Sequence, residues 1–416
     1  MRKFLFIMSL FLSCCRLACG QEADTDKFLR GVTNYSQERF AAAGEIFSGL
    51  HRDFPADDAV SYYLGLTEFA LGQVDSSEAH LRLAVSQDST NIWYWEALAS
   101  LYNSKGERSS FAAICEKLLE LNPSQYNNPY TLTVVGDEMM NRRADAKALE
   151  YYDRALELDP DYAPAELGRL EILRFQGNFP PFFLTLDHFV RNDLVRDDIK
   201  SQYIGALMER MDSRFYWVWG EQLNKLADIC VKQAPDDPGA NLNKLRLTII
   251  ENKQDSIIYM CGRLAEAARK AGDKENLVLA LSTAGDMSWQ LGDRREAYRF
   301  YDEALEVDPD CTAVLNNYAY YLSEEGRSLR KALKMSRRAI ALEPDNATYL
   351  DTCGWILHLL GRPKEAKPLF KHAMIYGGKD SSVILEHYSE ILEALGERDL
   401  SIYYGSLAEQ KKSQGL

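Results

Sequence analysis

Residues 312–346 of this chain read TAVLNNYAYYLSEEGRSLRKALKMSRRAIALEPDN, and residues 347–373 read ATYLDTCGWILHLLGRPKEAKPLFKHA. Each segment contains an apolar run with helical spacing, a turn with a glycine, and a second apolar run. Apolar residues at this spacing predict an amphipathic helix, and a glycine predicts its end. The two segments therefore predict two successive helical hairpins. Equivalent points of two hairpins, Pro344 and Gly378, lie 34 residues apart.

The same pattern recurs along the chain, with a small residue at the eighth position of each unit. Glycine inside a helix costs about 0.5–1 kcal/mol relative to alanine, so its repetition needs a steric reason. A close approach of the two helices supplies that reason, with a large side chain from position 24 filling the space beside the small residue. The small residues are Gly31, Gly65, Ala99, Gly136, Gly285, Ala319 and Gly354, and the large ones are Phe47, Leu81, Tyr152, Tyr301 and Phe370.

This period and these residue types resemble the tetratricopeptide repeat, a helix–turn–helix unit with the pattern W-x2-L-G-x2-Y, then A-x3-F, then P. The resemblance implies an all-α fold, a right-handed superhelical solenoid of helix–turn–helix repeats. It also implies that the first helix of each unit lines a concave groove in which a peptide or protein partner is held.

The repeats divide the chain into regions of unequal regularity. About four well-phased units fill 24–162, and about four more fill 278–416, the last with a polar end typical of a cap. Between them, 163–277 predicts divergent helical hairpins with a period nearer 37. The polar pairs Asn192-Asp193 and Asp197-Asp198 mark the best candidate for a break, and the prolines at 180–181 are expected to open a helix.

The composition is that of a folded protein with an acidic surface. Of the 416 residues, 46% are hydrophobic and 26% are charged, and the formal net charge is −14. An acidic surface repels phosphate backbones, so we expect no nucleic-acid partner.

The first 20 residues resemble an export signal rather than part of the fold. Two basic residues precede an apolar run at 4–12, and small residues surround a cleavage site after Gly20, which would leave Gln21 as the first residue. Lipidation at Cys14 or Cys19 is the alternative, although neither cysteine has the usual preceding leucine. We therefore expect an exported bacterial protein, periplasmic or associated with the outer membrane, that contacts a membrane only through such a lipid anchor.

Five cysteines remain outside this segment, an odd number that cannot pair completely. We expect buried free thiols, with Cys311, in a predicted turn, the most exposed. No catalytic or phosphate-binding motif is present, and the histidines are scattered, so we expect neither an enzyme, nor a cofactor, nor a metal site.

Groove positions implied by the resemblance supply the candidate binding residues. The two tryptophans among them have an alternative role, packing between neighbouring units. The candidates for peptide or protein binding are Asp286, Trp289, Asn316, Asn317, Tyr320, Asp351, Trp355, His358, Glu386 and Glu390.

The charge of these positions restricts the ligand. Asn317 stands where relatives that grip a C-terminal carboxylate place an asparagine, but the basic residues that complete such a clamp are absent from the corresponding positions. A neutral or basic ligand therefore suits the groove better.

These observations favour a non-catalytic, protein-binding scaffold of the bacterial cell envelope. The alternative is a catalytic accessory or saccharide-binding protein that uses a cleft in the divergent middle. That alternative predicts carboxylates that converge beside Trp217 and Trp219, whereas the scaffold hypothesis predicts no such pocket.

Overall fold

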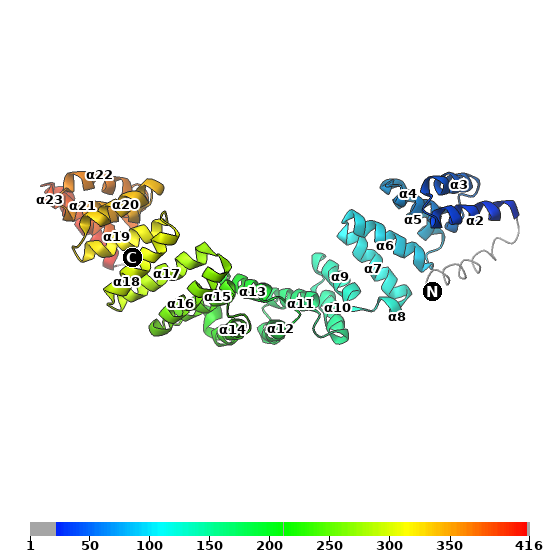
Figure 1. The fold of residues 1–416 in the computed structure, drawn as a ribbon, viewed down its shortest axis with the longest axis horizontal. Coiled ribbons are helices and arrows are strands. Elements are labelled where there is room, and N and C mark those ends of the chain that lie inside the picture. Colours follow the sequence, from blue (N-terminus) through cyan, green and yellow to red (C-terminus); the bar gives the residue numbers. More distant parts are fainter. Residues whose placement is uncertain (1–21, 211, 414–416) are drawn as a thin grey trace. The chain divides into compact units, whose positions relative to one another are not determined.

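A computed structural model describes residues 22–210 and 212–413, and every regular element in these ranges is helical (Figure 1). The internal contacts divide the chain into two compact units between Leu194 and Val195, a point that lies between Asn192-Asp193 and Asp197-Asp198 and inside the divergent region. Each unit is a series of antiparallel helical hairpins in chain order. The predicted all-α solenoid is therefore confirmed.

The first unit consists of short helices, most of 13–15 residues. They are α2 (Glu22–Ser36), α3 (Phe40–Asp53), α4 (Asp58–Ala70), α5 (Val74–Gln87), α6 (Ile92–Lys105), α7 (Arg108–Leu121), α8 (Pro123–Tyr126), α9 (Pro129–Asn141), α10 (Asp145–Leu158), α11 (Ala163–Phe175) and α12 (Phe179–Arg191).

The second unit begins with longer helices and returns to regular ones. Its elements are α13 (Asp197–Glu209), α14 (Ser213–Gln233), α15 (Pro238–Ile250), α16 (Gln254–Ala271), α17 (Lys274–Gln290), α18 (Arg294–Val307), α19 (Thr312–Glu324), α20 (Leu329–Leu342), α21 (Ala347–Leu359), α22 (Pro363–Ala373), the 3-10 turn η1 (Gly378–Asp380), α23 (Ser382–Ala394) and α24 (Arg398–Ser413). Three helices here are longer than the 13–15 residues typical of the first unit: α14 has 21 residues, α16 has 18 and α17 has 17. Because they lengthen their hairpins, the middle region departs from a 34-residue period.

The glycines at the eighth position have the steric role that their repetition predicts. A Cβ on Gly285 would lie 2.6 Å from Cε1 of Tyr301, and one on Gly136 would lie 2.8 Å from Cε1 of Tyr152. Gly31, Gly65 and Gly354 face Phe47, Leu81 and Phe370 in the same way. These five large side chains are all fully buried. The two helices of each such hairpin can meet this closely only because no side chain intervenes.

Polar residues and prolines set the helix ends. Asn91, Asn128 and Asn346 each precede a helix and accept hydrogen bonds from its first free N–H groups. The prolines at 180–181 lie in the first turn of α12, as expected. The caps fix where each hairpin begins, and so the phase of the side chains on its faces.

One continuous apolar core runs through the second unit from Leu245 in α15 to Ala408 in α24. The predicted polar end of the last repeat is present only at 409–413, where the residues are polar. Earlier in α24, Ile402 is 63% exposed and Tyr403 is 56% exposed, so the outer face of this helix is partly apolar. Position 24 of this repeat holds Gly405, and Tyr404 packs on Tyr388 instead.

The described cysteines agree with the sequence-based expectation. Cys115, Cys230, Cys261 and Cys353 are buried free thiols, and Cys311 is partly exposed. The predicted signal segment, its cleavage site after Gly20 and the alternative lipidation sites Cys14 and Cys19 lie outside the described residues. Within the described ranges, no helix is both long and apolar enough to cross a bilayer.

Candidate functional site

The candidate binding residues lie on the first helices of four successive hairpins, α17, α19, α21 and α23. Polar contacts connect these helices in pairs. Nδ2 of Asn317 in α19 lies 3.4 Å from Oδ1 of Asp286 in α17, and Nδ1 of His387 in α23 lies 2.9 Å from Oδ1 of Asp351 in α21. We call the set Asp286, Asn316, Asn317, Tyr320, Asp351, Trp355, His358 and His387 the groove row.

Asp286 has a structural partner in addition to any ligand. The hydroxyl of Tyr301, the side chain that packs against Gly285, donates to its carboxylate. Tyr152 donates to Asp137 in the same relation in the first unit, at 2.7 Å. Burial raises the pKa of both carboxyl groups. The tyrosine–aspartate hydrogen bond therefore belongs to the repeat itself. Only the lone pairs of the Asp286 carboxylate that Tyr301 does not occupy can accept a hydrogen bond from a ligand.

Trp355 is the aromatic centre of the groove row. Its ring stacks on that of His387 with 4.1 Å between centroids, and on that of His358 with 5.2 Å between centroids. Burial lowers the pKa of His387, but the hydrogen bond to Asp351 and the nearby Glu390 and Glu386 outweigh it, so the net pKa is raised. A histidine that is more readily protonated therefore lies between a carboxylate and an indole.

The sequence interpretation missed His387. His387 is the sixth residue of its hairpin when the count starts at Ser382, and Asn317 is the sixth when it starts at Thr312. Each side chain forms a hydrogen bond with an aspartate of the preceding repeat. This shared position was the available signal. The extra turn η1 before α23 obscured it, because it lengthens the connection from α22.

Two buried polar atoms in the groove row have no hydrogen-bond partner among the described residues: Oδ1 of Asn316 and Nδ1 of His358. Asn316 is only 4% exposed, and its Nδ2 lies 3.4 Å from Oδ1 of Asn317. Because protein covers both atoms, they do not contribute directly to a ligand surface.

The remaining candidates are placed differently. Trp289 stacks on Tyr321 with 4.3 Å between centroids and carries the Arg294 guanidinium 3.6 Å from its ring centre, so it packs within the array. Glu386 forms an ion pair with Lys412 in α24 at 2.8 Å. Glu390 is exposed, and Tyr320 is half-buried with its ring edge-on to Tyr321.

A second feature lies in the divergent middle. A surface hollow of about 560 Å³ is lined by residues of α14 and α15 and of the turn that follows α15, and it includes Trp217 and three carboxylates. This hollow corresponds in part to the pocket that the alternative hypothesis predicts and the scaffold hypothesis does not. Trp219 is not among the lining residues, so the alternative hypothesis described only one of its two tryptophans correctly.

No group of three histidine, cysteine, aspartate or glutamate side chains suited to a metal ion occurs in the part of the chain that the structure describes.

Comparison with known proteins identifies the repeat. The family model described as tetratricopeptide repeat matches residues 278–311, which contain Gly285 and Tyr301. Two rice proteins (Oryza sativa subsp. japonica), DnaJ protein P58IPK homologs B and A, are each 24% identical to this chain over 264 residues, 58% of its length. The chain spans about half the length of these relatives, 55% and 54% respectively.

Solved structures with a similar arrangement include yeast Tom70, a Naa15/Naa10 complex bound to HypK-THB, and MamA from Desulfovibrio magneticus RS-1. Tom70 is 13% identical, with 95% of this chain and 96% of that chain covered and a TM-score of 0.35. The Naa15/Naa10 match is 13% identical, covers 92% and 68%, and has a TM-score of 0.37. MamA is 12% identical, covers 42% and 96%, and has a TM-score of 0.36.

The matched repeat and the recurrence of its glycine contact in both units define an all-helical repeat protein of the protein-interaction class. The chain is a tetratricopeptide-repeat protein. Proteins built from this repeat are generally scaffolds rather than catalysts.

Proposed function

We propose that this protein is a non-catalytic scaffold that holds a neutral or basic peptide segment of a partner protein along the groove row. The observation that carries the proposal is the groove row itself, where aromatic, amide and acidic side chains from four consecutive hairpins lie in sequence. Aromatic surface supplies affinity and directional polar groups supply register in such sites.

The charge of the groove row favours this ligand class. Asp286 and Asp351 are acidic, and Glu390 is exposed on the adjoining α23. The positions that would hold a basic clamp for a free carboxylate are occupied instead by Ala313 and Glu324 in α19, and by neutral residues in α21.

The experiment is a selection of peptides from a random display library on the full chain. We expect enrichment of lysine or arginine over aspartate and glutamate, and equal binding of synthetic peptides with a free or an amidated C-terminus. Selected peptides that are acidic, or that require a free carboxylate, would reject this ligand class.

The double variant Tyr320→Ala with Trp355→Ala tests the location. We expect it to abolish binding of the selected peptides while circular dichroism shows an intact helical fold. Tyr259→Ala is the matched control, because Tyr259 is an exposed aromatic residue of α16 outside the groove row. Equal binding by the double variant and the control would place the peptide site elsewhere.

We further propose that the protein is exported to the bacterial envelope, on the strength of the signal-like residues 1–20. N-terminal sequencing of the mature protein tests this. Soluble export predicts Gln21 as the first residue, whereas a lipid anchor predicts a modified Cys14 or Cys19. An intact Met1 in the mature protein would contradict both.

A further inference from the structure

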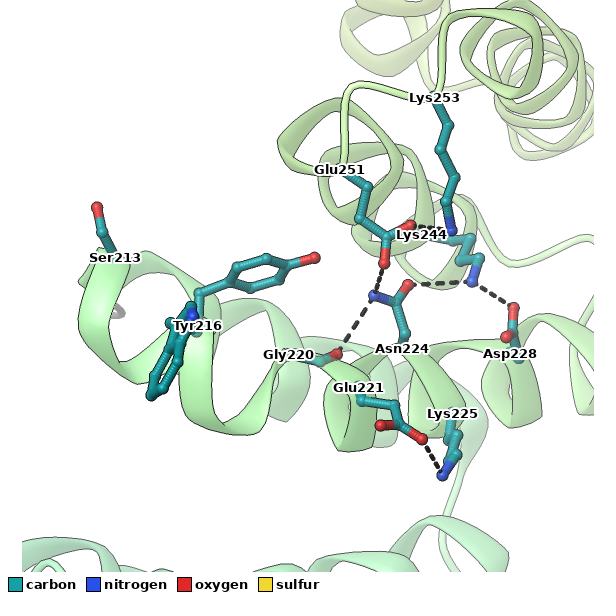
Figure 2. A pocket seen from close by; sticks show the side chains of 11 residues that line it. Ser213, Tyr216, Gly220, Glu221, Asn224, Lys225, Asp228, Lys244, Glu251 and Lys253 are labelled. Carbon is teal, nitrogen blue, oxygen red and sulfur yellow. Dashed lines mark hydrogen bonds and ion pairs between the residues drawn. The ribbon is translucent and has the colours of Figure 1, made fainter.

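The surface hollow in the divergent middle is formed by one face of α14, by Lys244 in the middle of α15 and by the turn that follows α15 (Figure 2). α14 contributes Ser213, Tyr216, Trp217, Gly220, Glu221, Asn224, Lys225 and Asp228, and α15 and its following turn contribute Lys244, Glu251 and Lys253. None of these residues belongs to the groove row.

Asn224 is the centre of the wall. Its Nδ2 donates to Oε1 of Glu251 at 2.7 Å and to the carbonyl of Gly220 at 3.3 Å, and its Oδ1 accepts from Nζ of Lys244 at 3.1 Å. Figure 2 shows these bonds running from the α14 backbone across to the turn after α15. A buried amide with both ends engaged holds the wall in one arrangement.

Every carboxylate of the wall is paired with a lysine. Glu221 pairs with Lys225, Asp228 with Lys244, and Glu251 with Lys253, each at 2.6 Å. The three charges of each sign balance. Because these charges balance, the wall offers no net attraction to a charged ligand, whereas a neutral ligand can hydrogen-bond to the remaining lone pairs and N–H groups.

The aromatic part of the hollow is unusually open to solvent. Trp217 is 86% exposed, so its large ring contributes little to the core. Tyr216 is held back over its own helix because Gly220 has no side chain; a Cβ there would lie 2.8 Å from Cε2 of the Tyr216 ring. An exposed indole beside a dense, neutralised polar wall is an arrangement that favours a ligand with one apolar face and many hydroxyl groups.

We propose that this hollow binds a neutral oligosaccharide, with the C–H face of a sugar ring on Trp217 and its hydroxyl groups on the lysine and carboxylate side chains. Sugar hydroxyls both donate and accept, which matches a wall where the two kinds of group alternate. A peptide backbone presents one donor and one acceptor per residue, spaced about 3.3 Å apart, and matches this cluster less well.

The site binds rather than hydrolyses. Glycoside cleavage needs one carboxyl group whose pKa is raised so that it can act as an acid. The hydrogen bond from Lys225 instead lowers the pKa of Glu221. Asp228 and Glu251 each form an ion pair with a lysine, and no bond-breaking step is assigned to the hollow.

Isothermal titration of the full chain tests the proposal with cellohexaose, maltohexaose, mannohexaose and N-acetylchitohexaose as neutral probes, and with oligogalacturonate as an acidic one. We expect saturable binding of at least one neutral probe, stronger than that of the acidic probe. Its affinity should change little between about 0.1 M and about 1 M salt, although the screening length falls from about 10 Å to about 3 Å.

Three variants locate the binding. Trp217→Ala should weaken it about tenfold or more, which corresponds to about 1.4 kcal/mol, without changing the fold. Gly220→Ala should also weaken it, because the new methyl group displaces Tyr216 into the hollow. Val218→Ala is the matched control, since Val218 is an exposed neighbour outside the lining.

Absence of saturable binding by all four neutral probes would overturn the proposal, and so would equal affinities of Trp217→Ala and Val218→Ala. If Trp217→Ala abolished binding of the groove peptides instead, the hollow would be part of a protein interface. The variant with Tyr320→Ala and Trp355→Ala should bind the saccharide normally. The proposals for the groove row and for the hollow can therefore be rejected independently of each other.

Discussion

The contact between Gly285 and Tyr301 provides the sharpest test of the repeat assignment. A methyl group on Gly285 would meet the edge of the Tyr301 ring at 2.6, 2.8 and 3.0 Å, where ordinary contacts begin at 3.4 Å. The ring is fully buried and its hydroxyl is bonded to Asp286, so it cannot move aside freely. We therefore expect Gly285→Ala to overpack the hairpin, an effect that costs about 1–3 kcal/mol.

Gly262→Ala is the matched control for this variant. Gly262 also lies inside a helix, α16, but a Cβ there would meet no atom within 4 Å. Alanine in place of glycine should stabilise such a helix by about 0.5–1 kcal/mol. Because Gly285→Ala gains the same propensity, the difference between the two variants isolates the steric cost, which we expect to be about 1–3 kcal/mol.

Urea denaturation followed by circular dichroism gives the two free energies of unfolding, and hydrogen exchange in α17 and α18 shows whether the loss is local. The same sign and size of effect for both variants would refute the reasoning, because the helices of the hairpin would then not meet at Gly285. Repeat arrays can unfold in several steps, so the exchange measurement gives the more direct answer.

Three further outcomes are expected. Tyr152→Phe should cost about 0.5–1.5 kcal/mol in urea unfolding, because the 2.7 Å hydrogen bond from the Tyr152 hydroxyl to Asp137 is lost while water can still solvate the exposed Asp137; an unchanged midpoint would contradict that bond. The pKa of His387 is raised above its usual value of about 6.5, so its stabilising effect should be complete below that pH and decline as pH rises through the folded-state pKa. Asp351→Asn should flatten this dependence of the urea midpoint on pH, and an identical slope in both proteins would reject the pairing. Iodoacetamide should modify Cys311 in the native chain well before the other four described cysteines, which are buried, and equal rates would contradict their burial.

The repeat architecture was predictable from sequence because its causes are local. Helical periodicity, a small residue at position 8 and a large one at position 24 act within a single hairpin, and Gly31 with Phe47 shows the same contact as Gly354 with Phe370. Within 215–231 the apolar residues recur at helical spacing, and the single helix α14 spans them.

The two candidate sites were less predictable from the sequence, because they are formed by contacts between different hairpins. His387 was missed because its partner, Asp351, lies 36 residues away on another helix, and only the packing of α21 against α23 brings them together. Trp289 was assigned to the groove by its repeat position, with packing between units as the alternative, and its stacking on Tyr321 of the next hairpin became visible only in the structure.

By itself, the amino-acid sequence determined that this chain forms hairpins, where most of them begin and which faces meet, because those choices depend on spacing and side-chain volume within about 34 residues. The tertiary structure alone decided which polar groups converge, namely Asp351 with His387 and Asn224 with Glu251. The physical reason is that a hydrogen bond between helices requires a particular distance and direction, and these are set by how the helices pack against each other rather than by any one helix.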